Sequence, residues 1–291
     1  MTTLLRRAWK FFSRYPMMAF SLSTISSLIV IAALTTLLSH YGIDWPRNPN
    51  ETHLNERLLS PNWNHWLGTD HLGRDVFSRM LHGTTISITV GLTAMAVSLV
   101  IGVTVGTIAG YYGGKIDQLL MRSVDALLCF PTFFLMLTTV ALLGPSLRNI
   151  IVVLGFLGWT ATSRLLRAEI LTLREKPYFH AARVLGERRW KLIFLHLLPN
   201  TAGLILVTAI LGVPEAILAE AGLSFLGFGV QPPQATWGNI IADGKTYFLD
   251  AWWLIFFPGL AILITSLSFY LLGNSFLVIL EKNLAANNYR R

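Results

Sequence analysis

The run His180-Ala181-Ala182-Arg183-Val184-Leu185-Gly186 lies between the fourth and fifth apolar stretches of the chain, and Leu198-Pro199 closes the same polar segment. A pair of small residues, a glycine four residues after the second alanine and a terminal Leu-Pro predict two short helices that meet at a tight bend. Small side chains would let another protein approach the backbone closely. The segment is therefore suited to docking rather than to catalysis.

The composition is that of an integral membrane protein. Of 291 residues, 53% are hydrophobic and 13% are charged, and the mean hydropathy is +0.56. A water-soluble domain of ordinary composition carries a larger charged fraction. Roughly 20 apolar residues cross a bilayer as a helix. The sequence therefore predicts an all-α integral membrane protein with six transmembrane helices, at 17–38, 86–110, 119–143, 149–164, 201–226 and 251–279.

The basic residues are distributed unevenly among the segments that connect these spans. The formal net charge is +8, and most of the 23 lysines and arginines lie near the termini and between spans four and five. By the positive-inside rule, this distribution predicts a multi-pass protein with both termini in the cytoplasm, surrounded by membrane lipid. No nucleic-acid partner is expected, because such a surface needs base-stacking aromatic residues beside its charge.

This topology divides the chain into consecutive parts. They are a cytoplasmic N-terminal segment (1–16), a first span (17–38), an extracytoplasmic loop (39–85), the remaining transmembrane domain (86–279) and a cytoplasmic tail (280–291). The polar cytoplasmic segment within the transmembrane domain is 165–200. The first span is read as an uncleaved anchor, because its apolar run exceeds that of a typical signal peptide and no cleavage motif follows. The single cysteine, Cys129, excludes an intrachain disulfide.

Two further runs stand out at the outer side. One is Leu67-Gly68-Thr69-Asp70-His71-Leu72-Gly73-Arg74-Asp75-Val76-Phe77-Ser78-Arg79. Its two glycines, an Asx-type turn at Asp70 and its alternating charges predict a compact, self-bonded entry into the membrane. The other is Glu220-Ala221-Gly222-Leu223-Ser224-Phe225-Leu226-Gly227-Phe228-Gly229. Its glycines favour close helix packing, and the following Pro232-Pro233 favours an extended external segment.

Together the three runs resemble the "C"-type permease subunit of the oligopeptide, dipeptide and nickel branch of ABC importers, over roughly residues 65–273. The polar segment is similar to that family's EAA loop, with His180 in place of its glutamate and His196 in place of its isoleucine. The chain departs from the family at Gly273-Asn274-Ser275-Phe276, where many members have Gly-Asp and a basic tail.

This resemblance implies a type I ABC importer (MetI-like) permease fold in a bacterial inner membrane. The implied partners are a second homologous permease, two ATP-binding subunits and an extracytoplasmic substrate-binding protein. The implied ATPase-coupling residues are His180, Ala181, Ala182, Gly186, Leu198 and Pro199. The implied function is ATP-driven import of peptides, and import of nickel or a metal chelate is the alternative. An ion-coupled transporter and a membrane-embedded enzyme are less favoured.

The chain is not expected to hydrolyse ATP. Asp243-Gly244-Lys245-Thr246 ends like a P-loop, but the motif requires a glycine at position 239, where this chain has Asn239. The predicted topology also puts the segment outside, away from ATP. Energy must come from a partner, and no catalytic residue or cofactor is predicted.

Two acidic residues of the fifth span are candidates for the solute path. An ionised carboxylate at the bilayer centre costs roughly 2.5–3.5 kcal/mol on insertion scales, so such groups usually face a cavity or a partner. We therefore expect Glu215, and with it Glu220, to line the path; a helix-packing role is the alternative. No metal site is predicted, although five histidines lie in or beside the outer loop, because their spacings match no ligand pattern.

Overall fold

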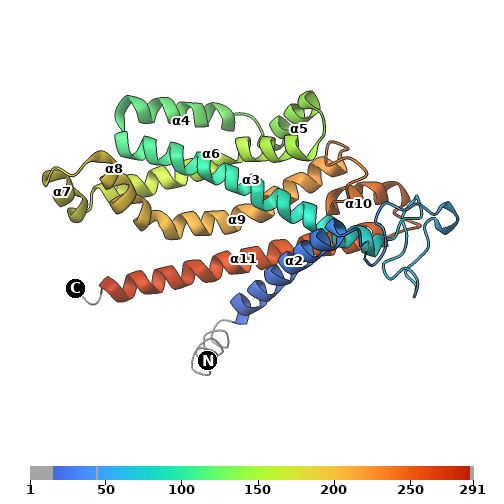
Figure 1. The fold of residues 1–291 in the computed structure, drawn as a ribbon. Coiled ribbons are helices and arrows are strands. Elements are labelled where there is room, and N and C mark those ends of the chain that lie inside the picture. The colour runs from blue at the N-terminus through green and yellow to red at the C-terminus, as the bar shows by residue number, and fades with distance from the viewer. Residues whose placement is uncertain (1–15, 44, 289–291) are drawn as a thin grey trace, which may run out of the picture.

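The computed structural model describes residues 16–43 and 45–288 as a bundle of long helices (Figure 1). The longest are α2 (Pro16–His40), α3 (Val76–Tyr112), α6 (Leu147–Arg174), α9 (Leu198–Phe225) and α11 (Trp253–Asn288). The described part of the chain has no β-strand and one isolated bridge, between Thr69 and Asp75. The all-α membrane fold is therefore confirmed.

The third predicted span, 119–143, is broken. It consists of α4 (Gly114–Leu128) and α5 (Thr132–Leu143), which are bent by 81° to each other. The break has a local cause, because Pro131 precedes α5 and has no N–H to continue the helical hydrogen bonding. Five helices are long and apolar enough to cross a membrane, and the bent pair brings the number to six if it is one span.

Two helices extend beyond the predicted spans at their polar ends. The helix that contains the second predicted span, 86–110, begins at Val76, because Asp75 accepts a hydrogen bond from the Ser78 N–H at 2.8 Å and caps the helix. The helix that contains the fourth predicted span, 149–164, continues to Arg174. Its polar end is held in the helix by ion pairs with α4, Arg164 with Asp125 and Arg167 with Asp117.

Small residues bring α3 and α6 together along most of their length. A Cβ atom added at Gly102, Gly106 or Gly110 would lie 2.6–2.9 Å from atoms of α6. Glycines at spacings of four let two membrane helices approach at backbone distance. The α3–α6 pair is therefore the closely packed centre of the bundle, and α9 packs against both helices.

The short elements gather at the two ends of the bundle (Figure 1). At one end lie α7 (Pro177–Val184), α8 (Arg189–Lys191) and a π-helical turn, Leu192–Leu197. At the other end lie α10 (Trp237–Gly244) and two 3-10 turns, Leu54–Glu56 and Lys245–Tyr247. Of the predicted terminal segments, residues 1–15 and 289–291 lie outside the described residues; α11 continues as far as Asn288.

Candidate functional site

The polar segment between α6 and α9 folds into two short helices with a bend at Gly186. Gly186 has φ +74°, a conformation that favours glycine. Its N–H donates to Arg183 O at 3.1 Å, and the Glu187 N–H donates to Ala182 O at 3.2 Å, which ends α7 in a left-handed cap. The predicted bend is confirmed. Ten residues assigned to this segment, 165–174, belong to α6 instead.

One face of this segment is anchored in the chain's own core. Phe179 and Ala182 of α7 are buried in a cluster that also contains Leu192 and Leu197. The remaining buried members come from α6 and are Leu166, Ile170 and Leu173. The Ala182 side chain therefore faces the core of the chain. Ala181 and His180 are exposed, so they are the residues on the surface that a partner protein could contact. Leu204 and Ile205 of α9 pack against the same cluster, so α7 shares a core with both α6 and α9.

The opposite face presents an apolar tip that the sequence motif did not single out. Val184 is 86% exposed and Leu185 is 83% exposed, directly before the bend.

Burial and the neighbouring carboxylate of Glu169 raise the pKa of Tyr178, which lies on the same short helix. At the far end of the segment Pro199 is exposed and Leu198 is half-buried, at the start of α9.

The two histidines that depart from the EAA pattern occupy different surroundings. His196 Nε2 lies 2.8 Å from Glu187 Oε2, so this pair ties the bend to the turn that leads into α9. His180 Nε2 lies 3.9 Å from Glu175 Oε2, and both side chains are exposed. His196 thus has a structural role inside the segment, whereas His180 lies on its surface.

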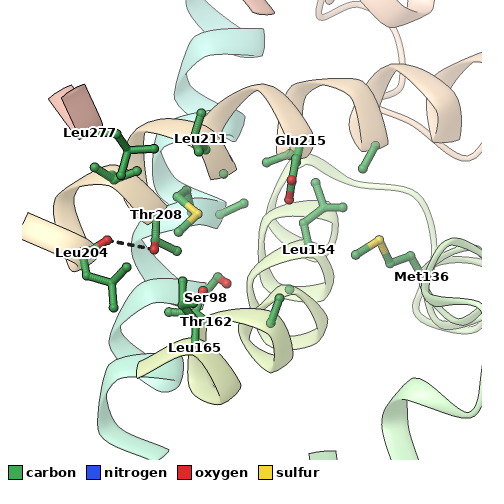
Figure 2. Close-up of a pocket in the computed structure, with 18 residues that line it drawn as sticks. Ser98, Met136, Leu154, Thr162, Leu165, Leu204, Thr208, Leu211, Glu215 and Leu277 are labelled. Carbon is green, nitrogen blue, oxygen red and sulfur yellow. Dashed lines mark hydrogen bonds between the residues drawn. The ribbon is translucent and has the colours of Figure 1, made fainter. Parts of the chain in front are cut away.

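A cavity of about 420 Å³ lies deeper in the bundle, between α3, α5, α6, α9 and α11. Its lining is mostly apolar, and Glu215 is the single charged residue that contributes to it. Figure 2 shows the Glu215 side chain pointing from α9 toward Leu154 of α6. Ser98, Thr162 and Thr208 supply the hydroxyl groups of the lining. The cavity can therefore hold a small polar solute group beside one carboxylate.

Glu220 does not share this cavity. It is 1% exposed, and its Oε1 accepts hydrogen bonds from Ser224 Oγ at 2.7 Å and from Thr236 Oγ1 at 3.0 Å. Thr236 is the N-cap of α10, so the carboxylate joins the end of α9 to that helix. The placement favours the helix-packing alternative for Glu220 and separates it from Glu215.

The run that precedes α3 forms the self-bonded turn expected from its sequence. Asp70 accepts hydrogen bonds from the N–H groups of Leu72 and Arg74 at 2.8 and 3.0 Å, and from Arg74 Nε at 2.6 Å. Arg74 Nη2 also donates to Asp243 at 3.1 Å, and Arg79 Nη2 lies 3.6 Å from the same carboxylate. The segment that resembled the end of a P-loop therefore supplies a counter-ion to this turn.

Asp70 and His71 of this turn and Asp243 of α10 place their possible metal-ligand atoms within 4.8 Å of one another. Arg74 and Arg79 already neutralise its two carboxylates. A divalent cation bound here would have to displace both arginines from the carboxylates, and their positive charges would oppose its binding. These residues therefore do not fit a metal site.

Comparison with known proteins identifies the family. The profile described as "Binding-protein-dependent transport system inner membrane component" matches residues 102–286. The chain belongs to this family. It is therefore a multi-pass membrane component of a transport system, and the resemblance predicted from its motifs is confirmed.

Three curated relatives cover nearly all of this permease. It is 38% identical to the "Dipeptide transport system permease protein DppC" of Alkalihalophilus pseudofirmus, over 92% of the permease and 86% of the relative. It is also 38% identical to the "Probable D,D-dipeptide transport system permease protein DdpC" of Escherichia coli, with coverages of 89% and 87%. The "Glutathione transport system permease protein GsiD" of Pectobacterium atrosepticum is 36% identical, with coverages of 92% and 88%.

Proposed function

We propose that this permease is one of two transmembrane subunits that together form the solute path of an ATP-driven peptide importer. Two ATP-binding subunits dock on its cytoplasmic side and hydrolyse the nucleotide, and a substrate-binding protein delivers the peptide outside. The names of the three relatives, which refer to dipeptides, D,D-dipeptides and glutathione, support peptides as the solute class.

The single observation that carries this proposal is the two-faced segment around Gly186. Its inner face is packed into the cluster of Phe179, Ala182 and the α6 residues, and its apolar tip, Val184 and Leu185, is exposed. An apolar tip on a rigid support is suited to insertion into a groove of another protein. His180, Ala181, Ala182, Gly186, Leu198 and Pro199 build this docking element. The proposed topology puts it, and both termini, in the cytoplasm.

Alternating access then follows from the connections of the docking element. Closure of the ATPase dimer moves α7, and the shared core transmits this movement to α6 and α9. These two helices supply most of the lining of the cavity that contains Glu215. A rigid rotation of the two helices changes the side on which the cavity is open. Glu215 binds a cationic group of the solute, such as the ammonium group of a peptide.

Replacement of Leu185 by glutamate tests the docking assignment. Leu185 is exposed, so Leu185→Glu should leave the fold of the permease intact while placing a charge in the apolar contact. Loss of a central interface contact costs at least about 2 kcal/mol of binding free energy, which weakens the affinity roughly thirtyfold. We expect the variant to lose the ATPase subunits during co-purification and to lose peptide uptake.

Leu249→Glu is the matched control, because Leu249 is also a highly exposed leucine (91%) but lies between α10 and α11, at the opposite end of the molecule. It should retain the ATPase subunits. Wild-type retention of the ATPases by Leu185→Glu would refute the docking assignment.

A further inference from the structure

The amphipathic helix α4 lies beside transmembrane helices rather than flat on the membrane surface. It begins two residues after the end of α3, contacts both α3 and α6, and runs alongside them (Figure 1). Together with α5 it is long and apolar enough to cross a membrane as one broken span. As part of such a span it would lie at membrane depth, although several of its side chains are charged.

These polar side chains form a continuous stripe. Gln118, Arg122 and Asp125 are exposed and lie three or four residues apart, which places them on one face of the helix. Lys115 extends the stripe toward the cytoplasmic end, and Cys129, also exposed, extends it toward the break. We call these five residues the α4 stripe.

Neighbouring faces of α4 have a different character. Asp117 and Val124 are buried against the bundle, and Asp117 pairs with Arg167 of α6. Ile116 and Leu119 are exposed and apolar, so they can face lipid. The polar stripe thus lies between a packed face and an apolar face, and it covers only part of the helix surface.

Lipid is an unsuitable neighbour for this stripe. Asp125 pairs with Arg164 of α6, but the two side chains remain 59% and 50% exposed. Arg122 has no ion-pair partner among the described side chains. Charged side chains at membrane depth face the interior of a bundle or a water-filled cavity. The exposed charges therefore require water or a protein partner on this side of the permease.

Arg164, which pairs with Asp125 of the stripe, links the stripe to the helix that lines the cavity containing Glu215. Arg164 lies on α6 between Ala161 and Leu165, and both of these residues line the cavity. The lining of the cavity has one carboxylate and no basic residue, whereas the guanidinium groups of Arg164 on α6 and Arg122 on α4 are exposed outside this lining. A peptide with free ends carries an ammonium group at one end and a carboxylate at the other, and the two surfaces match these charges.

We propose that the α4 stripe, with Arg164, is a water-lined wall of the solute path, and that Arg122 and Arg164 bind the carboxylate end of the peptide. This inference rests on the proposed function and adds to it the position of a second charged site. Guanidinium groups bind carboxylates through paired, charge-assisted hydrogen bonds. In the absence of solute Arg164 pairs with Asp125; when the peptide arrives, its carboxylate replaces that of Asp125.

The first arm of the test measures exposure to water in the assembled transporter. In a Cys129→Ser background, Gln118→Cys places a thiol on the stripe, and Leu119→Cys places one at the same depth on the apolar face. Inside-out vesicles are treated with a membrane-impermeant methanethiosulfonate. We expect labelling at position 118 to be at least tenfold faster than at 119. Equal, slow labelling at both positions would overturn the water-lined wall.

The second arm measures recognition of the carboxylate in proteoliposomes. Uptake of a peptide is compared with uptake of its C-terminally amidated form, each at a concentration that saturates the binding protein. We expect the wild type to prefer the free acid, and Arg164→Gln and Arg122→Gln each to reduce this preference at least fivefold. Arg122→Gln removes no ion pair, so its effect does not depend on a broken fold contact. Arg164→Lys, which keeps the charge, should retain part of the preference.

The outcomes separate the two proposals. A wild type without preference, or variants with an unchanged preference, would overturn the carboxylate site while peptide uptake itself persists. A wild-type complex that hydrolyses ATP but takes up neither peptide would overturn the proposed function instead.

Discussion

Two glutamates five residues apart on α9 have opposite surroundings, and this difference assigns them different roles. Glu215 lies in a cavity and is exposed within the described chain, whereas Glu220 is enclosed and accepts two hydrogen bonds. Their positions on the helix explain the difference, because five residues turn an α-helix by about 500°, or 140° beyond one full turn. Hydropathy alone marked both residues as candidates for the path, and only the packing of α10 distinguishes them.

Removal of the charge at Glu215 tests its role in the path. Glu215→Gln keeps the size of the side chain but loses the charge-assisted contact to a cationic group, which contributes about 1.5–3 kcal/mol. We expect KM for peptide uptake to rise roughly tenfold or more, with the ATPase subunits still bound. Unchanged uptake kinetics for this variant would remove Glu215 from the path.

Truncation at Glu220 should affect stability instead. Glu220→Ala leaves the buried hydroxyl groups of Ser224 and Thr236 without their acceptor, at a cost of about 2–4 kcal/mol. Glu220→Gln retains an acceptor oxygen and is the matched control. We expect thermal unfolding in detergent to show a clearly lower Tm for the alanine variant and a smaller change for the glutamine variant. Identical unfolding curves for Glu220→Ala and the wild type would contradict this role.

At the scale of the elements, the close approach of α3 to α6 depends on Gly106. A Cβ atom there would lie 2.6 Å from the carbonyl oxygen of Ser163, a backbone atom that cannot move alone. We expect Gly106→Ala to force the helices apart and to lower the stability by about 1–3 kcal/mol, measured as Tm in detergent.

Gly259→Ala in α11 provides the control, because an added Cβ meets nothing within 4 Å. Alanine is favoured over glycine in a helix by up to about 1 kcal/mol, so this variant should be neutral or more stable. Equal effects of the two substitutions would show that helix propensity, rather than contact between α3 and α6, determines the result.

The sequence predicted the elements better than their ends. Apolar runs located each of the long helices, but charged residues ended the fourth predicted span at 164, although α6 continues to Arg174. The reason is that Asp117 and Asp125 of α4 neutralise Arg167 and Arg164 across the helix pair, and a linear hydropathy profile contains no such partner. The bend at Gly186 was predictable because glycine spacing is a local signal, whereas the inward direction of Ala182 depends on tertiary packing.

At the scale of the whole molecule, a series of packed and hydrogen-bonded contacts joins the two ends of the bundle. The docking element shares a core with α6 and α9, and α9 is joined by Glu220 to α10. α10 is joined in turn by Asp243 to the turn before α3. In the proposed mechanism, a movement imposed on the docking element would reach the opposite end of the bundle through these contacts, as alternating access requires.

This arrangement requires the docking element and α10 to be on opposite sides of the membrane, because they lie at opposite ends of the bundle (Figure 1). In a Cys129→Ser background, Arg188→Cys places an exposed thiol beside the bend, and Leu249→Cys places one next to α10. We expect an impermeant thiol reagent to label position 188 only in inside-out vesicles and position 249 only in right-side-out vesicles. Labelling of position 188 from outside would place the docking element away from ATP, and the chain could then not be driven by cytoplasmic ATPases.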